Sequence, residues 1–271
     1  ADQVVEAVLA GVTGRTRIAL LDHVTSQTGL VLPMRQLVRE LDRRGVDTLV
    51  DGAHAPGMLE LDLDGLGAAY FTGNCHKWLC APKGAAFLHV RRDRREGVRP
   101  LVISHGANSP RRDRSRFHLE FDWVGTADPT AVLCVPEAIR FMGSLLTGGW
   151  PELRRRNRGL ALGARDELCR ALGAAPPCPD EMIGSMAALP LPPGADEAPD
   201  SALYTDPLQA QLLERWRIEV PVIPWPAPPA RVVRISAEVY NSLQQYQLLA
   251  EALTALLAEE AASPPPRPAP A

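Results

Sequence analysis

A carboxylate and a lysine each follow an apolar run in the N-terminal half of the chain. Asp51 comes directly after the run at residues 48–50, and Lys77 follows the run at residues 68–71 after a polar break. Polar residues at the C-terminal ends of strands are the usual way in which an open α/β sheet builds a site. A lysine can form a Schiff base, and a carboxylate can keep a pyridine nitrogen protonated. This pattern suggests pyridoxal phosphate chemistry with Lys77 and Asp51 as the catalytic residues.

Taken singly, each of these residues has an ordinary explanation. An aspartate after a strand is often a helix cap, and most lysines are solvated surface charges. A second lysine, Lys83, competes for the same role. It lies in the sequence Ala-Pro-Lys-Gly, which is typical of a turn before the next predicted strand at residues 84–90. We therefore favour Lys77 over Lys83 as the Schiff-base residue.

The elements that precede Asp51 predict a strand–helix–strand unit. Residues 17–22 form a continuous apolar run, which is typical of a parallel strand covered on both faces. Pro33 begins a predicted helix and Gly45 ends it. The apolar positions of this helix share one face: Met34, Leu37, Val38 and Leu41. The unit should be parallel and right-handed, with Asp51 at the end of its second strand.

The order of elements predicts an α/β protein with a three-layer, mainly parallel sheet, followed by a smaller α+β domain at the C-terminal end. We assign residues 1–148 to the C-terminal part of a large, cofactor-binding domain, because Gly148-Gly149 precedes a long basic helix. The small domain covers residues 149–262. Residues 263–271 form a proline-rich tail that we expect to be disordered.

The bulk composition excludes several classes of function. Over 271 residues the apolar content is 46%, the charged content 23% and the net charge −3, which are ordinary values for a soluble globular protein. No basic patch with interleaved aromatic residues indicates a nucleic-acid partner, and no apolar run has transmembrane length. The five cysteines are odd in number and lack a metal-type spacing, which favours a reducing compartment, the cytoplasm. We expect Cys75 and Cys80, which flank the lysine, to pack in the core.

Four stretches in the N-terminal half of the chain carry a family resemblance. D-G-A-H-A-P-G at residues 51–57 and T-G-N-C-H-K-W-L-C-A-P-K-G at residues 72–84 resemble the class V aminotransferase family, which belongs to fold type I of the pyridoxal phosphate enzymes. S-H-G at residues 104–106 and W-V-G-T-A-D-P at residues 123–129 resemble the isopenicillin N epimerase-like branch more closely than class V in general. The resemblance implies a Schiff base on Lys77, with Asp51 bonded to the pyridine nitrogen.

The same resemblance implies further contacts to the cofactor. His54 takes a position near the phenolic oxygen, where the alternative is a satisfied structural histidine. Thr72, Asn74 and His76 would bind the phosphate or orient the lysine, and hydroxyl and amide groups can donate the hydrogen bonds that an anion needs.

Three more positions come from the loop at residues 23–29 and from the Gly-Thr pair at residues 125–126. Thr25 and Ser26 would lie close to the cofactor, although local turn hydrogen bonds explain short hydroxyl side chains equally well. Thr126 would reach the phosphate of the neighbouring subunit's cofactor, which implies a homodimer. In the alternative, its neighbours Asp128 and Pro129 simply begin the helix predicted at residues 130–145, with Pro136 kinking it.

A last motif, R-V-V-R-I-S-A-E-V-Y-N at residues 231–241, resembles the family pattern R-x-S-x-x-x-Y-N. The resemblance assigns Arg234 to the α-carboxylate of an amino-acid substrate, for which a planar guanidinium fork is suited. A structural ion pair is the alternative.

The resemblance also implies a long segment before Ala1, so we expect this chain alone to bind the cofactor poorly. The implied reaction at Cα is an epimerisation, a lyase reaction or an amino transfer. The loop before Arg234 has no cysteine, which argues against a cysteine desulfurase. The alternative is a truncated, catalytically inactive scaffold or binding protein, although the presence of Lys77, Asp51 and Arg234 argues against long decay.

Overall fold

The computed structural model describes residues 1–194 and 204–262, which fall into two compact units. The first unit consists of residues 1–24 and 32–150, and the second consists of residues 25–31 and the chain from Pro151 onward. The segment at residues 25–31 therefore belongs with the C-terminal part of the chain. The tail predicted at residues 263–271 lies outside the described residues.

The first unit is built around a four-stranded sheet. Its strands are β1 (Ile18–Asp22), β2 (Asp47–Asp51), β3 (Tyr70–Asn74) and β4 (Ala86–Val90). Its helices are α1 (Asp2–Ala10), α2 (Met34–Asp42), α3 (Leu63–Leu66), α4 (Arg116–Phe121), α5 (Thr130–Leu133) and α6 (Val135–Ser144), with a 3₁₀ turn, η1, at Arg92–Gly97. The strand order is β1-β2-β3-β4, in which β1, β2 and β3 are parallel and β4 is antiparallel to β3. The sheet is thus mainly parallel, as predicted.

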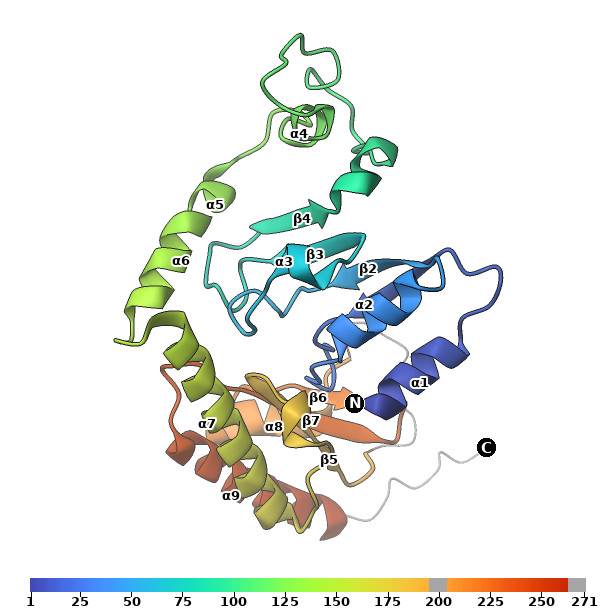
Figure 1. Ribbon diagram of the computed structural model, residues 1–271. Coiled ribbons are helices and arrows are strands. Elements are labelled where there is room, and N and C mark those ends of the chain that lie inside the picture. The colour runs from blue at the N-terminus through green and yellow to red at the C-terminus, as the bar shows by residue number, and fades with distance from the viewer. Residues whose placement is uncertain (195–203, 263–271) are drawn as a thin grey trace, which may run out of the picture. The chain divides into compact units, whose positions relative to one another are not determined.

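One face of this sheet is covered by α1 and α2 (Figure 1). The four apolar residues predicted to share a face of the second helix are all buried: Met34, Leu37, Val38 and Leu41. Met34, Leu37 and Val38 pack with Val50 of β2 and Phe71 of β3, both of which are fully buried. Burial of these side chains drives the docking of the helix onto the sheet.

The opposite face of the sheet is open in this chain. Ile18 and Leu20 of β1 are 52% and 66% exposed, and Leu88 of β4 is 40% exposed. The prediction that the strand at residues 17–22 is covered on both faces is therefore wrong for the described residues. A continuous apolar run occurs both in strands whose two faces are covered by the same chain and in strands with one exposed face. The run alone therefore does not distinguish the two cases.

Two element boundaries differ from the predictions. Strand β3 continues through residue 74, so Thr72 and Asn74 lie within the strand and not in a break after it. The helix predicted at residues 130–145 is divided into α5 and α6 at Cys134. Pro136 lies in the first turn of α6, where the missing backbone N–H removes no intrahelical hydrogen bond. Pro136 therefore lies at the start of a new helix, whereas the sequence predicts a kink within a single helix.

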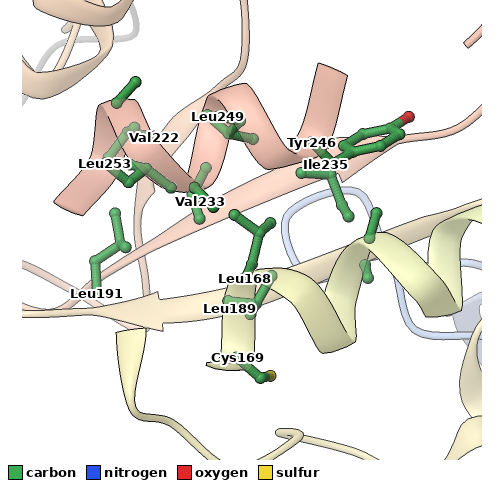
Figure 2. Close-up of a cluster of buried hydrophobic side chains, with 14 of the residues drawn as sticks. Leu168, Cys169, Leu189, Leu191, Val222, Val233, Ile235, Tyr246, Leu249 and Leu253 are labelled. Atoms are coloured by element: carbon green, nitrogen blue, oxygen red, sulfur yellow. The ribbon is translucent and has the colours of Figure 1, made fainter. Parts of the chain in front are cut away.

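The second unit is an α+β arrangement. Its elements are α7 (Gly149–Leu172), η2 (Asp180–Met182), β5 (Met186–Leu191), α8 (Pro207–Trp216), β6 (Val222–Pro224), β7 (Arg231–Ser236) and α9 (Leu243–Ala262). The strands form an antiparallel sheet in the order β5-β7-β6. Figure 2 shows its core, in which Leu168 of α7 and Leu253 of α9 gather with Val233 of the central strand.

A buried arginine forms hydrogen bonds that connect the strands of the second unit to its helices. Arg231, at the start of β7, is 3% exposed and donates to Oδ1 of Asp206 over 2.9 Å and to the carbonyl of Pro192 over 3.0 Å. Its second guanidinium nitrogen bonds Glu260 of α9. A buried charge is tolerated only when it is paired in this way, so the role of Arg231 is structural.

No single helix among residues 1–194 and 204–262 is both long and apolar enough to cross a membrane; only Thr130–Ser144 and Gly149–Leu172, taken together as a bent pair, would pass on length and composition.

Candidate functional site

Lys77 lies on the loop that joins β3 to β4. The ends of the loop are held together by a hydrogen bond of 2.9 Å from the Cys75 N–H to the Ala85 carbonyl, and the Ala81 N–H donates back to Cys75. Cys75 and Ala85 are buried against α5 and α6, and burial raises the pKa of the Cys75 thiol. Core packing is thus confirmed for Cys75, whereas it is wrong for Cys80, which is exposed. Lys77 therefore lies on a loop whose two ends are well packed.

The amine of Lys77 meets a histidine from the loop after the neighbouring strand. Its Nζ lies 3.2 Å from Nε2 of His54, and Nε1 of Trp78 lies 3.3 Å from Nδ1 of the same ring. All three side chains are half-buried. The structure therefore brings together two residues that the sequence analysis had singled out, Lys77 and His54, and adds Trp78, which it had not.

Gly57 allows the loop after β2 to pass closely beneath this group. Its φ is +88°, and a Cβ added there would lie 2.5 Å from the carbonyl oxygen of Trp78. Only glycine takes this conformation without strain. The backbone of residue 78 is thus positioned directly against the loop that carries His54.

Gly57→Ala is expected to destabilise the protein by about 1–3 kcal/mol, because it combines a strained φ with a collision against backbone. Urea unfolding of the two proteins measures this difference. Gly14→Ala is the matched control: a Cβ there meets no atom within 4 Å, so its effect should stay within about 0.5 kcal/mol. Equal effects of the two substitutions would contradict the expected role of Gly57.

Asp51 ends β2 on the open face of the sheet. Its Oδ1 accepts a hydrogen bond of 2.9 Å from the N–H of Ala53, and its carbonyl accepts one of 2.8 Å from His23. It stands in register with Asp22 of β1 on one side and with Thr72 of β3 on the other. In-register residues of neighbouring strands point to the same face, so these three side chains form one row across the sheet.

Asp22 is a member of this row that the sequence analysis missed. Burial, together with the negative charge of Asp51, raises the pKa of the Asp22 carboxyl. Within residues 1–194 and 204–262 neither carboxylate forms an ion pair. The sequence did contain a signal for Asp22. Asp22 and Asp51 are the last residues of two predicted parallel strands, and the C-terminal ends of neighbouring parallel strands lie side by side in a sheet.

Asp22→Asn is expected to stabilise the protein at neutral pH. The folded-state pKa of Asp22 lies above its usual 3.8, so the ionised carboxylate costs free energy once the pH exceeds the raised value, and costs nothing when the group is protonated. The variant should be up to about 1 kcal/mol more stable than the wild type at about pH 7, and equal to it at about pH 3. Urea unfolding at the two pH values tests this, with Glu60→Gln as an exposed control. A less stable variant at neutral pH would contradict it.

The other predicted phosphate contacts lie close by in the chain. Thr72 and Asn74 are half-buried residues of β3 on the open face, and Nδ1 of His76 lies 3.0 Å from the carbonyl of Ala85. Because a carbonyl only accepts, Nδ1 of His76 carries the proton in this bond and the neutral ring keeps Nε2 as an acceptor. The ring of His23 lies edge-on to Phe71, and burial lowers its pKa to about 4, so it is neutral at physiological pH.

Arg234 belongs to the second unit. It lines a cavity of about 300 Å³ together with Arg217, Ser236 and Tyr246. One of its guanidinium nitrogens donates to the carbonyl of Ser26, and its Nε is buried without a hydrogen-bond partner among the described residues. Burial lowers the pKa of Arg234. Its environment is thus the opposite of that of the carboxylate-paired Arg231.

The remaining predicted residues divide between the two units. Within the second unit, the hydroxyl of Thr25 lies 2.6 Å from that of Thr28 and accepts from the N–H of Leu30, a local turn network. Ser26 is exposed and contributes its carbonyl. In the first unit, Thr126 is exposed.

The whole chain resembles several solved structures. Over 90% of this chain and 60% of the other, it matches a cysteine desulfurase from Thermococcus onnurineus with a TM-score of 0.68 and 18% identity. It matches the cystine C–S lyase C-DES with a TM-score of 0.67 and 21% identity, over 93% of this chain and 64% of the other. The chain therefore has the α/β fold of these enzymes, and the predicted fold class is confirmed.

Sequence comparison gives the family. The profile of the aminotransferase class-V family matches residues 2–148. The chain is 41% identical to an isopenicillin N epimerase of Amycolatopsis lactamdurans over 94% of its length, and 38% identical to one of Streptomyces clavuligerus over 95%. It is 34% identical to a protein described as a probable L-cysteine desulfhydrase of Arabidopsis thaliana, over 90% of its length. The chain belongs to the aminotransferase class-V family, as its motifs indicated.

The chain spans only part of these relatives. It covers 64% of each of the two isopenicillin N epimerases and 51% of the desulfhydrase. The activity, substrate and partners of the whole protein are therefore proposals.

Proposed function

We propose that this chain provides catalytic and substrate-binding residues of a pyridoxal phosphate-dependent enzyme that acts at Cα of an amino acid. The observation that carries the proposal is the position of the Lys77 amine, 3.2 Å from the His54 ring, on a loop beside the strand that ends in Asp51. Membership of the aminotransferase class-V family supports it.

The side chains of the first unit fit this cofactor. An amine suits the aldehyde, and Lys77 supplies it from a packed loop. A carboxylate suits the ring nitrogen, and Asp51 stands at the open face with Asp22 beside it. Thr72 and Asn74 follow along the same face and can donate hydrogen bonds to a phosphate. His54 and His76 are the remaining side chains of the proposed cofactor site.

Bound pyridoxal phosphate supplies an electron sink that makes the Cα proton of an amino acid acidic. Lys77 would hold the cofactor, and its amine, when free, would take the Cα proton. Asp51 would accept a hydrogen bond from the ring nitrogen and so keep that nitrogen protonated. Arg234 binds the substrate carboxylate through its guanidinium fork.

The fate of that proton decides between the three reaction types. Return of the proton to the opposite face of Cα would give epimerisation, loss of a side-chain substituent would give a lyase reaction, and loss of the substrate's amino group to the cofactor would give amino transfer. The relatives named as isopenicillin N epimerases and as cysteine desulfhydrases support the first two. Removal of the Cα proton is common to all three, so it is the step to measure.

We propose further that the enzyme is a cytoplasmic homodimer in which Thr126 reaches the partner's cofactor. Thr126 follows Trp123 and Val124, which are 48% and 39% exposed. Exposed apolar side chains of this kind are typical of a surface that a second protein covers. The odd number of cysteines supports a reducing compartment. Light scattering gives the mass in solution, and a monomer at micromolar concentration would contradict the dimer.

The covalent linkage gives the direct test. The chain has two lysines, Lys77 and Lys83, and Lys83 is exposed. The protein is mixed with a large excess of pyridoxal phosphate, because this chain alone is expected to bind the cofactor poorly. It is then reduced with borohydride and digested, and the modified peptide is identified by mass spectrometry. We expect modification of Lys77 in large excess over Lys83. Equal modification of the two would contradict a dedicated site, and no visible absorption with no modification would favour the scaffold alternative.

A further inference from the structure

The two ring nitrogens of His54 face different partners, and this determines where its proton lies. Nε1 of Trp78 is 3.3 Å from Nδ1 of His54, and Nζ of Lys77 is 3.2 Å from Nε2. An indole nitrogen can only donate a hydrogen bond, so Nδ1 of His54 has to accept. A neutral imidazole with an accepting Nδ1 carries its proton on Nε2.

The Nε2–H of His54 is therefore directed at Lys77. A lysine ammonium has three donors and no acceptor, so it cannot receive this hydrogen bond, whereas a neutral amine has a lone pair that can. We infer that Trp78 is a positioning residue: through the tautomer of His54 it favours Lys77 as the neutral amine. The neutral amine is the form that attacks an aldehyde, and in this use the inference rests on the proposed function.

The other titratable groups around Lys77 show what this hydrogen bond has to oppose. Asp51 ends β2, three positions before His54 in the sequence, and a carboxylate favours the ammonium form of any lysine that it approaches. On the lysine loop itself, His76 is turned to the Ala85 carbonyl and Cys75 is a buried thiol. A donor aimed at Nζ opposes the ammonium form of Lys77, because it stabilises the neutral amine alone.

Removing the indole N–H should release this preference. In Trp78→Phe an aromatic ring remains, but Nδ1 of His54 can then take the proton. Nε2 becomes an acceptor, and a lysine ammonium fits beside it. The variant should therefore shift Lys77 toward the protonated form while His54, the partner of the lysine amine, stays in place.

Competitive acetylation measures this shift, because acetic anhydride reacts with amines in their neutral form. The cofactor is removed first, and mass spectrometry gives the ratio of acetylated Lys77 to acetylated Lys83 in the same molecules. In Trp78→Phe we expect this ratio at about pH 7 to fall roughly threefold to tenfold, the effect of one hydrogen bond. At about pH 11, where lysine amines are mostly neutral, the ratio should equal that of the wild type.

A pair of His54 variants supplies the control. The amide of His54→Gln can accept from Trp78 and donate to Lys77, so it should keep the wild-type ratio better than His54→Leu. An unchanged ratio at neutral pH in both Trp78→Phe and His54→Leu would overturn the inference. So would an equal change at both pH values, which reports access to the lysine and not its protonation. Acetylation needs no cofactor, so a failure of Lys77 to take up pyridoxal phosphate in the same preparation is a separate result against the proposed function.

Discussion

Lys77→Arg is expected to abolish covalent attachment of pyridoxal phosphate and to reduce exchange of the Cα proton of an amino acid by at least about a thousandfold. Arginine has a side chain of similar length, but a guanidinium does not form a stable Schiff base at neutral pH. The substitution therefore removes the nucleophile and the proton acceptor together, and general base catalysis alone contributes roughly 10²–10⁴-fold.

The measurement is hydrogen exchange at Cα in deuterated water, followed by proton NMR with added pyridoxal phosphate. Exchange precedes epimerisation, elimination and amino transfer alike, so it does not require the substrate to be known. Lys83→Arg is the matched control, because Lys83 is exposed in the turn before β4 and should retain full exchange. Loss of exchange in Lys83→Arg with retention in Lys77→Arg would reverse the assignment of the two lysines.

The parts of this site that could be predicted from sequence are those written in consecutive residues. Asp51, His54 and Lys77 were each singled out from their positions close to a predicted strand end, and the structure places His54 beside Lys77. The course of α2 and its four buried residues also followed from a 3.6-residue period, because the amphipathic pattern and the core obey the same geometry.

What could not be predicted depends on pairing between segments. Asp22 gains its neighbour through the register of β1 and β2, and Trp78 gains its role through a hydrogen bond to a residue 24 positions earlier. Neither signal is present in the composition or spacing of the residue's own segment. The bare face of β1 was missed for a related reason: a run of apolar residues reports what a strand can bury, but not whether the same chain provides the cover.

The second large effect is expected at Arg234. The protein gives this side chain little compensation for its burial: one bond to the Ser26 carbonyl, and a buried Nε without a partner among the described residues. Arg231, three positions earlier on the same strand, has two carboxylates. A partly buried cation that has no paired anion favours the binding of a ligand that carries a negative charge. An amino-acid carboxylate is such a ligand, and it matches the guanidinium fork.

Arg234→Met is expected to weaken binding of L-alanine by about a hundredfold in the presence of pyridoxal phosphate, since truncating one partner of a desolvated charge pair costs about 2–5 kcal/mol. Without ligand the variant should be at least as stable as the wild type, because it replaces an uncompensated charge with an apolar side chain. Thermal unfolding over a series of alanine concentrations gives both quantities, since a ligand stabilises the folded protein by an amount that grows with the logarithm of one plus the ratio of the ligand concentration to Kd.

Two controls separate charge recognition from general damage to the cavity. Arg217→Gln alters an exposed arginine of the same cavity and should leave binding nearly unchanged. Alaninamide, which lacks the carboxylate, should bind the wild type and Arg234→Met equally. Arg234→Lys should fall between the two proteins, because an ammonium keeps the charge but loses the two-pronged geometry. If Arg234→Met instead binds alanine normally and unfolds more easily, the arginine is structural, and the carboxylate site has to be sought elsewhere in the chain.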